Sequence, residues 1–184
     1  MKKAFSFAFL IFTLSICHAQ SNQQSVMEIS FDFGRKLGVA SNQFAVWIED
    51  SRGTVVKTLY ATRFTASGGW QRRPLSIPVW VKKSGLSALG KNEVDAFTGA
   101  TPRTGTLTYR WDGRDKNGNS MAAGEYRVFL EATLRNENGV LYNAPFTIGV
   151  NAAGNAIREA AAEYTGNSTR DRDMVKNVKV SFRP

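Results

Sequence analysis

One short polar segment combines residue types that could take part in covalent chemistry. It runs from Asp95 to Thr101 with the pattern Asp-x-x-Thr-Gly-Ala-Thr. Gly99 and Ala100 give a slim backbone beside the hydroxyl of Thr101, and an accessible hydroxyl can serve as a nucleophile. In a purely structural interpretation, Asp95 and Thr98 cap a turn and Thr101 begins the next extended segment. Both interpretations stay open from these seven residues alone.

The start of the chain predicts an export signal over residues 1–19. Two lysines precede an apolar run at residues 5–16, within the ~7–15 residues of a signal-peptide core. Small residues at Cys17 and Ala19 favour cleavage after Ala19. Lipid attachment to Cys17 is a competing interpretation, which the large Ile16 disfavours. The run is shorter than a bilayer span, so we expect a periplasmic or secreted protein with no transmembrane segment in the mature chain.

Loss of this signal removes the only cysteine and the only histidine, Cys17 and His18. The mature chain then has no disulfide, thiolate or imidazole. This excludes Cys/His zinc sites, haem held by these residues, and Ser-His-Asp or Cys-His catalysis. No metal-ligating or catalytic set is expected, and no carboxylate pair suits acid–base work, so a conventional hydrolase is the least favoured class. A redox function would need a bound cofactor.

Removing 19 of the 184 residues leaves 165, residues 20–184. This length predicts one domain with a sizeable core. The whole chain has a formal charge of +9. After the signal, its cations are scattered singly except for the close pairs Arg72-Arg73 and Lys82-Lys83. This charge suits either an ordinary soluble basic surface or a mild field that attracts anions or acidic partners. No basic run with interleaved aromatic residues indicates nucleic acid.

Apolar periodicity predicts an all-β chain. Alternation with a period of two, typical of half-buried strands, occurs at residues 27–33, 107–111, 126–130 and 178–182. A more continuous apolar run at 43–49, followed by a turn at 50–53, predicts a hairpin. Pro145 predicts an edge strand or a bulge. Seven or more short strands favour an immunoglobulin-like β-sandwich.

Two segments lack the alternating pattern that predicts strands. Residues 67–105 form a long inserted loop, in which residues 75–83 suggest a short helix, and long connections are often functional. Residues 156–164 suit either a helical turn or a weak strand. Glu125 and Glu131, on one predicted strand, are expected to be solvated.

A hairpin at residues 111–126 carries the strongest local turn signal. Its Asp-Gly and Asn-Gly pairs tolerate positive φ. A calcium loop is the competing interpretation, because Asp115, Asn117 and Asn119 are alternately spaced. Ser120 and Tyr126 stand where such a loop needs Gly and Glu. We therefore expect a structural turn.

This hairpin resembles immunoglobulin-like modules of bacterial exported proteins, including that of the flagellar hook-capping protein. A wider set of motifs resembles a family of predicted periplasmic proteins, domain of unknown function 2271, over residues 26–184. The motifs are Phe-Ala-Val-Trp-Ile-Glu-Asp at 44–50, Gly53 with Val-Lys-Thr-Leu at 56–59, Val-Asp-Ala-Phe-Thr-Gly-Ala-Thr at 94–101 and Trp-Asp-Gly-Arg-Asp at 111–115. Members are often encoded beside flavin transferases and PepSY-type membrane proteins. The resemblance implies an extracytoplasmic redox or iron-related setting.

The Asp-x-x-Thr-Gly-Ala-Thr segment is also similar to the acceptor signal of proteins that carry flavin mononucleotide (FMN) covalently. That resemblance implies a phosphodiester between FMN and Thr101, with Asp95 as a recognition residue. The remaining signal positions are Thr98, Gly99 and Ala100. The chain departs from the pattern after the acceptor, where it has Pro-Arg-Thr at 102–104 in place of an early second Thr or Ser. Pro102 also stiffens the segment.

Three aromatic residues near the segment, Trp70, Trp80 and Phe97, could stack on a flavin ring or pack the core. Arg103, and also Arg72 and Arg73, could meet a phosphate. The first functional hypothesis is an electron carrier, not a conventional enzyme, whose partners are a flavin transferase and a membrane redox protein. The second is a cofactor-free interaction module.

Overall fold

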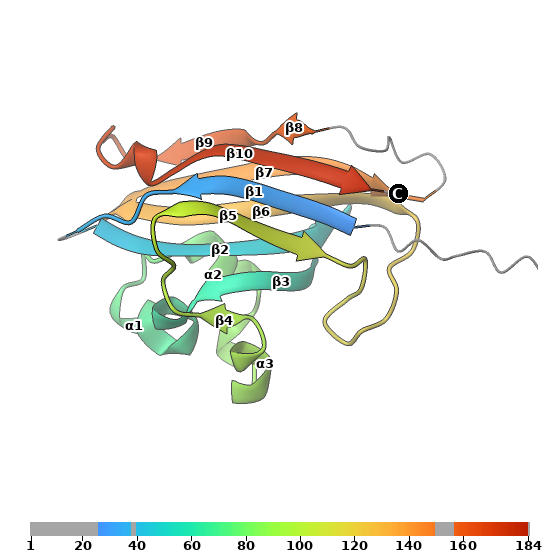
Figure 1. Cartoon of the computed structure of the whole chain (residues 1–184). Helices are drawn as coiled ribbons and strands as arrows, with labels where there is room; N and C mark the ends of the chain where they lie inside the picture. The colour runs from blue at the N-terminus through green and yellow to red at the C-terminus, as the bar shows by residue number, and fades with distance from the viewer. Residues whose placement is uncertain (1–25, 38–39, 150–156, 184) are drawn as a thin grey trace, which may run out of the picture.

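Two facing β-sheets make up most of the described structure (Figure 1). The computed structural model describes residues 26–37, 40–149 and 157–183. The predicted export signal, residues 1–19, lies outside these ranges. The arrangement is mainly β and sandwich-like, as predicted, while its immunoglobulin-like assignment stays a prediction.

The smaller sheet has four antiparallel strands in the order β5-β1-β10-β8. They are β1 (Val26–Phe33), β5 (Gly105–Trp111), β8 (Arg158–Glu159) and β10 (Val175–Arg183). The larger sheet has six strands in the order β4-β3-β2-β6-β7-β9 and is antiparallel except for the parallel pair β3–β4. They are β2 (Ala40–Asp50), β3 (Val55–Thr62), β4 (Thr98–Gly99), β6 (Gly124–Arg135), β7 (Asn138–Ile148) and β9 (Ala161–Thr165).

Apolar side chains from both sheets fill the space between them. Every second residue of β1 is buried there, which confirms the predicted half-buried strand. These residues are Met27, Ile29, Phe31 and Phe33. The inner face of β2 supplies Phe44, Val46 and Ile48, and β6 supplies Val128 and Leu130. The ring of Phe44 meets the ring of Phe31 edge-on, with centroids 5.6 Å apart.

The opposite face of the six-stranded sheet is buried as well. Trp47 of β2 is fully buried on this side, where its ring stacks on Phe129 of β6 at 5.1 Å. Both faces of β2 are therefore apolar, which explains why its sequence is a continuous apolar run and not an alternating one. The residues that cover this face are the segment 63–97, here called the outer layer.

The outer layer corresponds to most of the predicted long loop, and much of it is helical. It contains a π-helical turn (Thr65–Gly69), α1 (Trp70–Arg72), α2 (Pro78–Lys83), a 3-10 turn (Leu86–Ala88) and α3 (Lys91–Asp95). The predicted helix at 75–83 is confirmed in α2. Ile77 and Trp80, both fully buried, pack against the sheet together with Leu86.

The strands also test three local predictions, on the hairpin, on the segment after residue 156 and on Pro145. β2 and β3 form the predicted hairpin. Residues 158–165 are extended, in β8 and β9, so the strand alternative holds over the described part of that segment. β9 pairs with β7 only as far as Asn143. Pro145 therefore lies where β7 has no second partner among the described residues, as predicted for an edge.

The turn at 111–126 uses its own acidic side chain. The Asp115 carboxylate accepts hydrogen bonds from the backbone N–H groups of Asn117 and Asn119, each at 2.8 Å. The side-chain amide of Asn119 donates a further bond, and these bonds lower the pKa of Asp115. A second 3-10 turn (Arg172–Met174) precedes β10.

The expectation that Glu131 is solvated is wrong. Its side chain points from β6 into the outer layer and is 5% exposed. Its two carboxylate oxygens accept the backbone N–H groups of Val79 at 3.1 Å and Trp80 at 2.7 Å. Burial raises the pKa of Glu131 to about 7 despite these two bonds. No local pattern signals this burial, because an outward residue of a two-layer sandwich would face water.

Thr133, two residues further along β6, holds the same region. Its hydroxyl accepts the N–H of Ile77 at 2.8 Å and donates to the carbonyl of Leu75 at 3.1 Å. Ile77 has φ +44°, a left-handed conformation that β-branched residues rarely adopt. The bonds from Thr133 and the full burial of Ile77 maintain it.

We predict that replacing Glu131 with Gln changes how stability depends on pH. Because the folded pKa, about 7, lies above the ordinary 4.5, the native state holds the proton more tightly than the unfolded state. The contribution of Glu131 to stability is fully present below pH 4.5 and is lost as pH rises through about 7. From pH 5 to pH 8, the free energy of unfolding of the wild type, measured with urea, should fall by about 2–3 kcal/mol. Glu131→Gln should not show this fall.

The matched control is Glu125→Gln, on the same strand and exposed. This variant should keep the pH slope of the wild type. Equal slopes for the wild type and Glu131→Gln would contradict the buried-carboxyl account.

Candidate functional site

The Asp-x-x-Thr-Gly-Ala-Thr segment lies where the outer layer returns to the sheet. Asp95 ends α3, and the chain then enters β4, the edge strand of the six-stranded sheet. Thr98 pairs with Ala61 of β3 in parallel register. The N–H of Ala61 also donates to the carbonyl of Phe97 at 3.0 Å. The segment is thus fixed along an edge, with Ala100 exposed just beyond β4.

Tyr60 of β3 holds this segment through its ring and its hydroxyl. The hydroxyl donates to the carbonyl of Ala100 at 2.7 Å. The ring lies so close to Gly99 that a Cβ on that residue would stand 2.6 Å from Cε2 of Tyr60. Glycine is therefore needed at this position for close approach, not for an unusual φ. The small residues of the segment match the space that Tyr60 leaves.

Tyr60 is held in turn by other aromatic rings. It stacks on Phe44 with centroids 5.0 Å apart and lies 5.0 Å from Tyr109 of β5. Burial raises the pKa of Tyr60 to about 12 and raises that of Tyr109 as well. Both phenols are neutral at physiological pH, so Tyr60 remains a hydrogen-bond donor.

A second anchor follows three residues after Thr101. The hydroxyl of Thr104 accepts the N–H of Arg35 at 3.0 Å. Residues 101–103 lie between this bond and the Tyr60–Ala100 bond. Thr101 is half-buried, and within the described residues its hydroxyl makes no hydrogen bond. The hydroxyl is therefore not committed to a structural role.

The polar residues earlier in the segment have different surroundings. Asp95 is exposed and forms an ion pair with Lys91, one turn earlier on α3. The hydroxyl of Thr98 is buried and has no hydrogen-bond partner in the described part of the chain. Neither side chain caps the turn in the way that the structural interpretation expected, since no capping bond from Asp95 or Thr98 is present among these residues.

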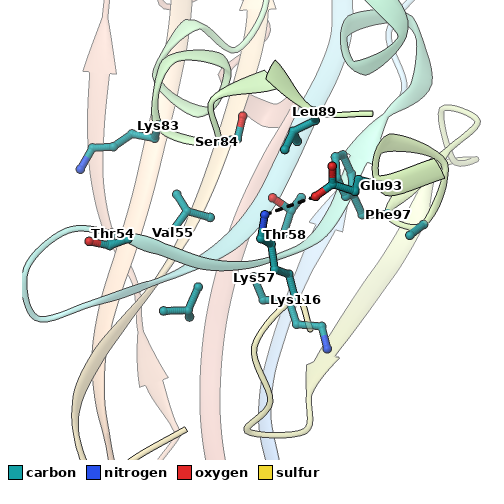
Figure 2. Close-up of a pocket in the computed structure, with 12 residues that line it drawn as sticks. Thr54, Val55, Lys57, Thr58, Lys83, Ser84, Leu89, Glu93, Phe97 and Lys116 are labelled. Atoms are coloured by element: carbon teal, nitrogen blue, oxygen red, sulfur yellow. Dashed lines mark hydrogen bonds and ion pairs between the residues drawn. The ribbon is translucent and has the colours of Figure 1, made fainter. Parts of the chain in front are cut away.

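A pocket of about 250 Å³ opens beside the segment (Figure 2). Its floor is the outward face of β3, including Val55 and Thr58, and its walls are Leu89 and Phe97 of the outer layer. Phe97 and the preceding Ala96 belong both to the pocket and to the segment. The volume is near the lower end of ligand sites, about 300–1,000 Å³, which suits a small flat group.

Three lysines stand around this pocket, each with a carboxylate partner. Lys116 pairs with Glu93 at 3.2 Å, Lys83 with Glu49 at 3.1 Å and Lys57 with Asp112 at 3.5 Å. A hydrogen bond from the Gly90 N–H, and next the one from Lys116, lower the pKa of Glu93. Because the charges of the three lysines are balanced by their three carboxylate partners, the pocket favours a neutral ring over a free phosphate.

The predicted ring and phosphate contacts fall in different places. Phe97 lines the pocket. Trp80 is fully buried, donates its indole N–H to the Thr58 hydroxyl at 3.2 Å and meets the edge of Phe97 at 5.8 Å. Trp70 belongs to the outer layer and is half-buried against the apolar cluster that contains Trp47 and Trp80. Arg103 is exposed between the two anchors.

Sequence reasoning missed Tyr60 and the lysines around the pocket. Tyr60 lies 40 residues from Ala100 in the chain, and nothing local in the alternation of β3 shows which residue faces the edge. Lys57, Lys83 and Lys116 come from three separate elements. No sequence signal brings such residues together.

The model of the family described as predicted periplasmic protein, domain of unknown function 2271, matches residues 24–167. The chain belongs to this family. The match spans 144 of the 184 residues and includes the whole Asp-x-x-Thr-Gly-Ala-Thr segment. The family assignment confirms the predicted periplasmic setting.

Other comparisons leave the function of this periplasmic protein open. No curated protein and no solved structure matches the chain. No helix among the described residues is long and apolar enough to cross a membrane. That part of the chain also holds no cluster of three or more acidic, histidine or cysteine side chains suited to a metal ion.

We predict that Tyr60→Phe loosens the segment without unfolding the protein. The change removes only the hydrogen bond to Ala100, whose net contribution to stability is about 1 kcal/mol. Trypsin should therefore cut after the exposed Arg103 several times faster, while the melting temperature falls by a few degrees at most. Gly99→Ala should have a larger effect, because the new Cβ would stand 2.6 Å from the Tyr60 ring, which packs against Phe44 and Tyr109.

The control is Tyr126→Phe, which removes a similar bond to the carbonyl of Ala122, 2.8 Å long, in the distant hairpin. Cleavage after Arg103 should stay at the wild-type rate in this variant. Equal acceleration in both variants would show that Tyr60 has no local role.

Proposed function

We propose that this periplasmic protein carries FMN covalently on Thr101 and transfers electrons outside the cytoplasm. The observation that carries the proposal is the uncommitted hydroxyl of Thr101, held between two anchors at the edge of a rigid sheet. Asp95, exposed on α3, and the slim pair Gly99-Ala100 leave the segment open to a transferase on one side.

Attachment would use the Thr101 hydroxyl as the nucleophile. With FAD as the donor, the hydroxyl oxygen forms a bond to the FMN phosphorus, the phosphoanhydride bond breaks and AMP leaves. The hydroxyl proton passes to a base of the transferase. The net result is one phosphodiester and no change in oxidation state.

Surroundings of Thr101 offer complementary contacts for the two ends of FMN. Arg103 is exposed beside the acceptor and can pair with the phosphate. The charge-balanced pocket with Phe97 on its wall is suited to part of a flat, neutral ring system. The protein supplies no other redox group, because its mature chain lacks cysteine and histidine. It would act as an electron carrier and not as a conventional enzyme, with a membrane redox protein as its partner.

The proposal is tested by the mass of the exported protein. The full chain is expressed with its native flavin transferase in an exporting host, and the intact mass is measured. We expect the addition of one FMN less one water, together with flavin fluorescence in a denaturing gel. Thr101→Ala should lose both signals, because it removes the attacking oxygen.

Thr108→Ala is the matched control, since Thr108 is an exposed threonine on neighbouring β5. It should carry FMN as the wild type does. An unmodified wild-type mass, in a host where the transferase modifies another acceptor, would refute the proposal. Modification that persists in Thr101→Ala would assign the site to another residue.

The alternative is a cofactor-free, immunoglobulin-like interaction module of the cell envelope. The two-sheet arrangement and the turn at 111–126 favour this alternative. It becomes the better account if Thr101 remains unmodified beside an active transferase.

A further inference from the structure

Positive charge is concentrated in one continuous part of the chain. Residues 51–92 contain eight of the 24 lysines and arginines and none of the 15 aspartates and glutamates. This stretch alone therefore carries +8, almost the whole formal charge of +9. It folds as the turn before β3, β3 itself and most of the outer layer, and these elements lie on one side of the molecule (Figure 1).

Half of these eight cations are neutralised by carboxylates from elsewhere. Arg52, Lys57, Lys83 and Lys91 form ion pairs with Asp50, Asp112, Glu49 and Asp95. The other four are Arg63, Arg72, Arg73 and Lys82. Within the described ranges, none of these four takes part in an ion pair.

Two of the three unpaired arginines lie over an exposed aromatic ring, and the third is its neighbour in the chain. The guanidinium of Arg73 lies 5.1 Å from the centroid of Phe64, and that of Arg72 lies 5.9 Å away. Arg63 directly precedes Phe64 in the chain. Phe64 is 36% exposed and Leu75 is 55% exposed. We call Arg63, Phe64, Arg72, Arg73 and Leu75 the arginine patch.

Buried polar contacts hold the two chain segments of this patch together. Thr65, next to Phe64, and Ser76, next to Leu75, join their hydroxyl groups at 3.0 Å. Gln43 of β2 accepts the Thr65 hydroxyl at 3.0 Å. The backbone at Gly69 passes so close to Phe64 that a Cβ would stand 2.2 Å from its carbonyl oxygen. The patch is therefore a preformed surface.

We propose that the arginine patch docks the protein on a membrane surface rich in anionic phospholipid. Guanidinium groups match phosphate oxygens in a fork geometry. Exposed Phe and Leu side chains beside them can enter the headgroup boundary, as in other interfacial proteins. An acidic protein surface would match the arginines, but it offers less to the exposed apolar pair. The lipid surface uses both features of the patch, and a periplasmic protein meets such surfaces.

The test measures binding of the purified exported protein, without flavin, to sedimented vesicles. Vesicles of phosphatidylglycerol and phosphatidylcholine should bind it, and vesicles of phosphatidylcholine alone should bind it much less. Replacing Arg63, Arg72 and Arg73 with Gln should lower the partition coefficient by about fivefold for each arginine, about 100-fold in total. Raising the ionic strength should also weaken the binding of the wild type to the anionic vesicles.

The matched control replaces Arg158, Lys176 and Lys179, exposed on the four-stranded sheet, with Gln. It changes the net charge equally and should keep most of the binding. Both variants should melt as the wild type does, since all six side chains are exposed. Equal binding to both kinds of vesicle, or equal loss in both variants, would overturn the proposal. If both kinds of vesicle bind equally and the arginine patch binds soluble polyglutamate, the patch would instead be assigned to an acidic protein partner.

Discussion

Burial of both faces of the six-stranded sheet is the constraint on which the rest of the structure depends. Phe44, Val46 and Ile48 of β2 face the smaller sheet, while Ala45 and Trp47 face the other way. A two-layer sandwich would leave Trp47 in water. The segment 63–97 must therefore fold over that face, and its helices follow from this need more than from their own propensity, because each is only a few residues long.

Polar contacts decide how the outer layer is placed on the sheet. Glu131 and Thr133 of β6 bind backbone groups at the start of α2, and Gln43 of β2 binds the hydroxyl of Thr65. Apolar packing is not directional, whereas these hydrogen bonds fix position and orientation. Placement of the layer in turn sets where the chain returns to the sheet as β4. Thr101 thus owes its position at the edge to residues far from it in the sequence.

Charge is distributed according to the same layers. Inside the pocket next to Phe97, each lysine has a carboxylate partner, so the field is weak where a neutral ring would lie. Around Phe64, the arginines have no such partners among the described residues. The proposed acceptor and the proposed docking patch therefore belong to one folded layer but differ in electrostatics. This separation would let the protein meet a charged surface without attracting anions to the pocket.

Sequence by itself determined strands β1, β2, β3, β5, β6, β7 and β10, the β2–β3 hairpin, the helix at α2, the export signal as a prediction and the family resemblance, because each depends on local periodicity or on contiguous motifs. It also singled out Thr101, whose modification stays a prediction. Tertiary structure alone decided that the long connection is a layer, that Glu131 is buried, and that Tyr60 clamps Gly99 and Ala100. These outcomes depend on which faces meet across 40 or more residues, and a local pattern holds no information on such contacts.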